Sequence, residues 1–126
     1  MSHPTGSGTV LLADDDPAIL KMTERVLQIV GYRSIAATDI GESLAALREH
    51  EIDLVLLDLH MPGMKGRPTI EEMRRLRPGL PIIIVTGRTE EETRKELGSE
   101  IDVGYLEKPF ELPAMIAEVR RATGAA

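Results

Sequence analysis

Short apolar runs alternate with longer amphipathic segments along this chain. The runs carry no charged residue, and they are Val10–Ala13, Ser34–Ala37, Leu54–Leu57, Ile82–Val85 and Val103–Leu106. Runs without polar alternation are typical of strands whose two faces are both buried, as in a parallel sheet. We therefore expect five strands that are covered on both sides.

The segments between these runs have helical spacing. In the first, one helix face collects Ile19, Thr23, Val26, Leu27 and Val30. Asp16 can cap this helix, Pro17 suits its first position, and Gly31 is placed to end it.

Three further segments also predict helices. The second has an apolar stripe made of Ile40, Leu44, Ala45 and Leu47. The third spans about Thr69–Leu76, with its start reset by Pro68, and the fifth spans about Leu112–Ala122, with Met115, Ile116 and Val119 inward. Five β-α units predict an α/β fold, in which helices cover both faces of an open, doubly wound, five-stranded parallel sheet.

The fourth helical segment has an unusual composition. Thr89–Glu92 forms a capping box, so a helix can begin there. From there to Glu100 the only large apolar residue is Leu97. We expect a fourth helix that is short or mobile, with little to anchor it.

The composition limits the functions to consider. The 126 residues suit one domain, which we place at 9–122, with a flexible leader at 1–8 and a frayed C-terminus or truncated linker at 123–126. A net charge of −6 and the lack of tryptophan disfavour direct nucleic-acid binding. The chain has no cysteine and no apolar run that could span a bilayer, so we expect a cytoplasmic protein without a membrane segment.

Acidic residues follow two of the predicted strands. Asp14 and Asp15 come directly after the first strand, and Asp58 ends the third. Sites in doubly wound sheets lie beyond the carboxyl ends of the strands, so three carboxylates meet there if these strands are neighbours. Their mutual repulsion needs a counter-charge, and carboxylate oxygens together with waters suit Mg²⁺.

Two further strand ends complete a chemical site. Thr86 ends the fourth strand and offers a hydroxyl donor, while Lys108 follows the fifth and can pair with Asp58. Phosphoryl transfer needs mainly positioning and charge neutralisation, which these groups and Mg²⁺ supply while Asp58 attacks. Taken alone, each residue has a plain structural role, such as a turn and helix cap for Asp14–Asp16. Their shared place at the strand ends favours the chemical role.

Four segments together resemble the receiver domains of two-component response regulators, from Val10 to about Arg121. They are VLLADDDP at Val10–Pro17, DLVLLDLHMPGM at Asp53–Met64, PIIIVTG at Pro81–Gly87 and GYLEKPF at Gly104–Phe110. The resemblance implies a flavodoxin-like fold with strand order 2-1-3-4-5. It also implies Mg²⁺-dependent transfer of a phosphoryl group from phosphohistidine to Asp58, which switches an output surface. Such a domain catalyses its own phosphorylation and dephosphorylation but is a signalling switch, not a turnover enzyme.

The resemblance assigns metal ligands by position. Asp15 is expected to bind the magnesium ion directly and Asp14 largely through water. Asp58 and the backbone carbonyl of His60 complete the protein's ligands, whereas Asp16 is a helix cap only.

The resemblance also assigns the catalytic and switch residues. Asp58, Thr86 and Lys108 form the catalytic set, and a cis peptide bond is expected between Lys108 and Pro109. Thr86 turns toward the phosphoryl group, and Tyr105 occupies the aromatic position that moves inward with it.

The implied phosphodonor is a sensor histidine kinase or a phosphotransfer protein. The output domain or target is unknown, and a phosphorylation-dependent dimer is left open. In relatives, small residues occur on the fourth helix and directly after it. This chain has Arg94 and Glu100–Asp102 at these positions, so we expect its output surface to differ from theirs. His60, as an exposed side chain at the rim of the cleft, and Arg88 are expected to control access of water to the acyl phosphate.

Two other classes of function are also considered. A magnesium-dependent phosphatase of the haloacid-dehalogenase type has a second aspartate two residues past its nucleophile, where this chain has His60. A degenerate interaction module that works without phosphorylation would not need all five of the side chains at the strand ends. These are Asp14, Asp15, Asp58, Thr86 and Lys108. Both fit less well than a receiver.

Overall fold

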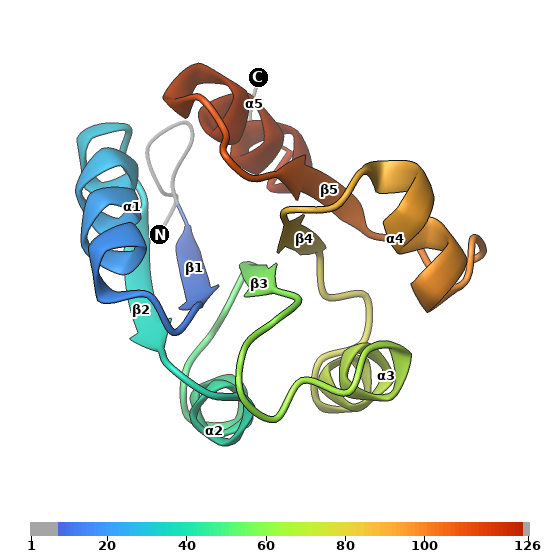
Figure 1. The fold of residues 1–126 in the computed structure, drawn as a ribbon. Helices are drawn as coiled ribbons and strands as arrows, with labels where there is room; N and C mark the ends of the chain where they lie inside the picture. Colours follow the sequence, from blue (N-terminus) through green and yellow to red (C-terminus); the bar gives the residue numbers. More distant parts are fainter. Residues whose placement is uncertain (1–7, 125–126) are drawn as a thin grey trace.

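The computed structural model describes residues 8–124, in which strands and helices alternate (Figure 1). The strands are β1 (Thr9–Ala13), β2 (Arg33–Ala37), β3 (Leu54–Asp58), β4 (Ile82–Thr86) and β5 (Gly104–Glu107). The helices are α1 (Pro17–Ile29), α2 (Ile40–Glu49), α3 (Arg67–Leu76), α4 (Glu90–Leu97) and α5 (Leu112–Ala122). All strand pairs are parallel and the order is β2-β1-β3-β4-β5, which confirms the predicted doubly wound fold.

Residues 1–7 and 125–126 of the expected leader and C-terminal end lie outside the described range. Gly8, which we had placed in the leader, accepts a hydrogen bond from the Arg33 N–H at 2.8 Å. No helix in the described part of the chain is both long and apolar enough to cross a bilayer.

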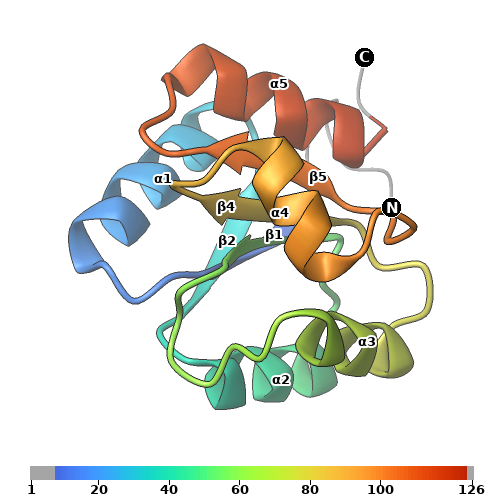
Figure 2. The same ribbon diagram turned by 45° about the vertical axis from the view of Figure 1, so that its right-hand side comes forward.

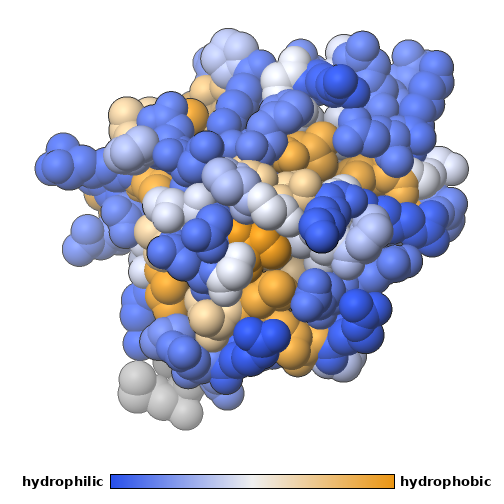
Figure 3. All heavy atoms as spheres, turned by 60° about the horizontal axis from the view of Figure 1, so that its bottom comes forward, coloured by the Kyte–Doolittle hydropathy of each residue, from blue (hydrophilic) through white to orange (hydrophobic). Residues whose placement is uncertain are grey.

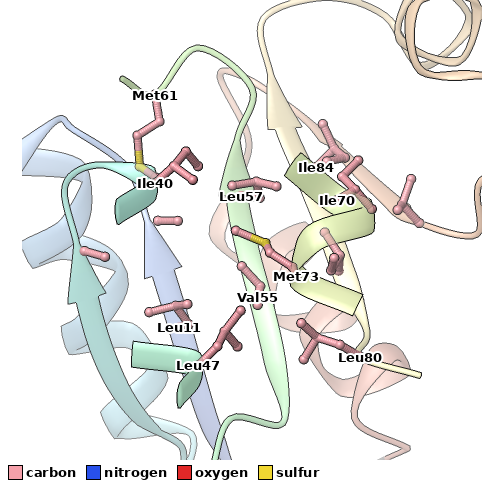
Figure 4. Close-up of a cluster of buried hydrophobic side chains, with 14 of the residues drawn as sticks. Leu11, Ile40, Leu47, Val55, Leu57, Met61, Ile70, Met73, Leu80 and Ile84 are labelled. Atoms are coloured by element: carbon pink, nitrogen blue, oxygen red, sulfur yellow. The ribbon is translucent and has the colours of Figure 1, made fainter. Parts of the chain in front are cut away.

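Helices cover the sheet on both faces (Figures 1 and 2). One apolar cluster joins the sheet to α2, α3 and α4, and a second joins it to α1 and α5. In the first cluster, Val55 of β3 lies between Leu47 of α2 and Met73 of α3, and Leu57 of β3 lies on the other side of Met73 (Figure 4). Each fully buried aliphatic side chain contributes roughly 1.5–3 kcal/mol, so the two aliphatic clusters are the main source of stability. Figure 3 shows the α2–α3 side, where hydrophobic residues in the middle are surrounded by hydrophilic ones.

The expectation that all five strands are buried on both faces was wrong for the two edge strands. All five residues of β3 and of β4 are buried. In contrast, Arg33 and Ala36 of β2 and Glu107 of β5 are exposed. β2 and β5 each have one neighbouring strand, so the helices at the margins of the sheet cover them incompletely.

Helix α1 begins where its capping residue predicts, whereas α3 begins earlier than predicted. Asp16 caps α1, because its side chain accepts from the N–H groups of Ala18 and Ile19 at 2.9 and 3.4 Å. α3 begins at Arg67, two residues earlier than predicted, after Gly66 at φ 73°. Pro68 therefore lies in its first turn, where a missing N–H costs no hydrogen bond.

Several buried positions, among them Leu20, Ser43, Ala46 and Thr93, were missing from the predicted helix faces. Leu20 of α1 is buried, whereas the predicted Ile19 is only partly so. Ser43 and Thr93 have no exposed surface. Their hydroxyls each donate to a carbonyl one turn earlier at 2.9 Å, which explains how polar side chains fit inside an apolar interface.

α4 has eight residues and is short, as expected. The expectation that little anchors it was wrong, because Thr93 and Leu97 are 0% and 1% exposed. Beyond its end, Glu100 forms an ion pair with Arg67 of α3. Arg74 of α3 also binds this connection, since it donates to the Asp102 carbonyl at 2.5 Å. The mobility of α4 remains a prediction, which amide hydrogen exchange can test.

Replacing Arg74 with alanine should loosen the connection between α4 and β5. The side chain donates to the carbonyls of Leu80 and Asp102, and both bonds are lost in Arg74→Ala. We expect unfolding free energy to fall by about 1–2 kcal/mol and amide exchange across residues 98–103 to accelerate. The exposed neighbour Arg75 provides the control, because Arg75→Ala removes the same charge. Equal exchange in the two variants would contradict the proposed anchoring.

Candidate functional site

Three carboxylates converge beyond the ends of β1 and β3. The two strands are neighbours with Ala13 paired to Leu57, so Asp14 and Asp58 follow paired positions. One oxygen from each of Asp14, Asp15 and Asp58 lies within 4.8 Å of the others. Asp14 and Asp58 are 7% and 5% exposed, while Asp15 is exposed. The convergence that the sequence predicted is therefore present.

Backbone N–H groups orient two of these carboxylates. Asp58 Oδ1 accepts from the His60 N–H at 2.9 Å, and Asp14 Oδ1 accepts from the Asp16 N–H at 2.9 Å. Each bond spans two residues, a local turn that Asp favours. The side chain of His60 is exposed, as predicted.

Lys108 brings a positive charge to the carboxylates. Its Nζ lies 3.2 Å from Asp14 Oδ2 and 3.5 Å from Asp58 Oδ2. The contact with Asp58 was predicted, but the closer one with Asp14 was not. The signal for it was in the sequence, since both residues directly follow a strand at the same edge of the sheet.

The surroundings of Lys108 fix both its charge and its place. Burial alone would lower the pKa of Lys108, but the charges of Asp14 and Asp58 outweigh it and raise the pKa above the usual value. The ammonium is therefore charged at neutral pH. The Lys108 N–H donates to the Thr86 carbonyl at 2.7 Å, and the peptide bond to Pro109 is cis, as predicted.

Thr86 and Tyr105 lie on neighbouring strands beside the cleft. Thr86 is buried, and its Oγ1 accepts from the Arg88 N–H at 3.2 Å. A hollow of about 170 Å³ is lined by Thr86, Arg88, Glu90, Tyr105, Leu106 and Glu107. The side chain of Arg88 forms an ion pair with Glu96 at 2.9 Å. The structure thus brings together the predicted hydroxyl, the predicted aromatic ring and Arg88.

The arrangement suits the binding of a cation and, with the cation in place, reaction with an anionic group. Three carboxylates face one ammonium, so the cleft keeps an excess of negative charge among its own groups. Clustered carboxylate oxygens are hard ligands, and Asp14, Asp15 and Asp58 could hold a divalent cation such as Mg²⁺. A buried carboxylate beside an ammonium could act as a nucleophile toward a phosphoryl group.

Curated relatives are similar over most of this chain. The probable transcriptional regulatory protein TcrX of Mycobacterium tuberculosis is 31% identical over 119 residues, which are 92% of this chain and 51% of TcrX. The DNA-binding response regulator MtrA of Mycolicibacterium smegmatis is 39% identical over 114 residues, 88% of this chain and 48% of MtrA. The sensor kinase CckA of Brucella abortus is 34% identical over 118 residues, 92% of this chain and 12% of CckA. The chain therefore spans about half of the two regulators and a small part of the kinase.

Solved structures agree with the fold. A CheY-like response regulator receiver domain protein from Methanospirillum hungatei has a TM-score of 0.81 and 31% identity, covering 93% of this chain and 94% of that one. The chemotaxis response regulator CheY4 of Vibrio cholerae has a TM-score of 0.82 and 29% identity, covering 92% and 98%. The sequence profile of the response regulator receiver domain matches residues 10–120. The chain belongs to the response regulator receiver family of two-component systems.

Proposed function

We propose that this receiver accepts a phosphoryl group on Asp58 in a Mg²⁺-dependent reaction. The observation that carries the proposal is the meeting of Asp14, Asp15 and Asp58 within 4.8 Å, with Lys108 beside two of them. The proposed donor is a phosphohistidine on a sensor histidine kinase or a phosphotransfer protein. The relatives support this class of partner, since they include a sensor kinase and response regulators.

The residues of the chain have distinct tasks in this reaction. A carboxylate oxygen of Asp58 forms a bond to phosphorus as the P–N bond of the donor breaks, and the electron pair of that bond goes to the imidazole nitrogen. Lys108 offsets negative charge on the phosphoryl oxygens. Thr86 Oγ1 already accepts from the Arg88 N–H, so its own proton is available to donate to a phosphoryl oxygen.

The donor set fits a magnesium ion. Both oxygens of Asp14 already have partners, Oδ1 with the Asp16 N–H and Oδ2 with Lys108. Asp58 has partners on both oxygens as well, so these bonds do not distinguish the two carboxylates. Asp14 is proposed to bind the ion largely through water, and the exposed Asp15 is proposed as a direct ligand together with Asp58 and the His60 carbonyl. When bound, the ion supplies positive charge next to the phosphoryl oxygens.

Incubation with acetyl phosphate tests this proposal. With Mg²⁺ we expect the mass to rise by one phosphoryl group per chain, located on the peptide that contains Asp58. Chelation of the metal should prevent the change. Rapid turnover of small phosphomonoesters would instead indicate a phosphatase, and an unchanged mass under all conditions would indicate an interaction module.

A further inference from the structure

An arginine of α4 lies against the ring of Tyr105. The guanidinium carbon of Arg94 is 4.8 Å from the ring centroid, which is within cation–π range. Arg94 is itself held by Glu90, whose Oε2 accepts from Nε at 2.8 Å and lies 2.8 Å from Nη2. Figure 2 shows α4 in front of β5, the strand that carries Tyr105. The pair on α4 therefore presents an oriented cation to the ring.

The hydroxyl of Tyr105 is poorly satisfied in this position. Among the described residues, its Oη is the one buried side-chain polar atom without a hydrogen-bond partner. A buried hydroxyl without a partner destabilises the conformation that contains it. The Arg94 stack is a contact that favours this position of the ring.

Tyr105 also adjoins the group proposed to sense the phosphoryl group. The ring and Thr86 line the same hollow of about 170 Å³, together with Glu90. Movement of the Thr86 hydroxyl toward a phosphoryl oxygen therefore changes the surroundings of the ring. A movement of Tyr105 away from α4 would break its contact with Arg94.

We propose that Arg94, oriented by Glu90, is a latch that holds Tyr105 in place and biases this receiver toward its resting conformation. The proposal rests on the proposed function. A contact made in only one of two conformations shifts the equilibrium toward that conformation. Phosphorylation then has to overcome the latch, which makes α4 a determinant of how readily the switch responds.

Titration with beryllofluoride, a phosphoryl analogue, in the presence of Mg²⁺ tests the latch. Binding is followed by the fluorine NMR signal of the bound analogue. In Arg94→Met the half-saturating concentration should fall about two- to five-fold, because less of the protein rests in the latched conformation. Glu90→Gln should give a smaller shift in the same direction. Lys95→Met, which removes an exposed charge one residue along α4, should leave the concentration unchanged.

A Tyr105→Leu background separates the latch from a general effect on α4. If Arg94 acts through the ring, Arg94→Met has no further effect in that background. A wild-type-like concentration in Arg94→Met, or an equal shift with and without Tyr105, overturns the latch while the proposed function stands. Failure of the wild-type protein to bind the analogue overturns the proposed function, and the latch with it.

Discussion

Replacing Asp58 with asparagine should abolish phosphorylation and at the same time make the fold more stable. The amide oxygen of asparagine is a poor nucleophile, so we expect the rate of phosphoryl acceptance to fall by at least roughly 10³-fold. The mass assay with acetyl phosphate and Mg²⁺ measures this loss. Phosphorylation of Asp58→Asn at the wild-type rate would place the acceptor elsewhere.

The gain in stability follows from the charges of the cleft. Asp58→Asn removes one of three carboxylates that face a single ammonium. The asparagine oxygen can still accept from the His60 N–H, and Lys108 keeps its contact with Asp14 at 3.2 Å. Without Mg²⁺, we expect urea unfolding to show a gain of about 1 kcal/mol.

A matched variant shows whether the gain comes from the cluster. Glu51→Gln makes the same change in net charge at an exposed position at the opposite end of β3. Its stability should stay close to that of the wild-type protein. If both variants gain equally, relief of overall charge, and not relief within the cleft, is the cause.

The fold could be predicted because its central strands are uniformly apolar. The interior strands β3 and β4 leave no position for a charged side chain before their carboxyl ends, so the sequence indicates both the strands and the points where they stop. The edge strands have similar apolar runs, and their partial exposure depends on strand order. A single run does not contain that information.

The hydrophobic pattern also failed to predict which hydroxyl side chains are buried. Ser43 and Thr93 count as polar in the sequence, yet each can be buried because its hydroxyl donates to the carbonyl of the residue that caps its helix. Because Thr93 was counted as polar, the sequence predicted that little would anchor α4. The anchoring by Arg67 and Arg74 of α3 joins positions far apart in the chain, so no local pattern predicts it.

The site could be predicted as a set of residues, but its internal pairing could not. Strand ends and spacing brought Asp14, Asp58 and Lys108 together, whereas side-chain geometry decides which carboxylate Lys108 contacts more closely. One ammonium lies beside two buried carboxylates, so we expect Lys108 to stabilise the cleft. Under the proposed function, removal of this charge should affect phosphoryl acceptance as well.

Replacing Lys108 with glutamine should slow phosphoryl acceptance by about 10²–10³-fold, the usual effect of losing one group that stabilises transition-state charge. Without metal, it should also destabilise the fold by about 2 kcal/mol, because Asp14 and Asp58 are left buried without their cation. Added Mg²⁺ should restore part of the stability by binding the folded state. Lys108→Arg keeps the charge and is the control for stability.

A double variant tests whether Lys108 acts on stability through the carboxylates. In the Asp58→Asn background one buried charge is already gone, so Lys108→Gln should cost less free energy than in the wild-type protein. The difference between the two costs, measured by urea unfolding without Mg²⁺, is the coupling between Lys108 and Asp58. Because Nζ lies closer to Asp14 than to Asp58, the Asp14→Asn background should reduce the cost of Lys108→Gln further. Equal costs in all backgrounds would mean that Lys108 stabilises the fold through packing and not through these charges.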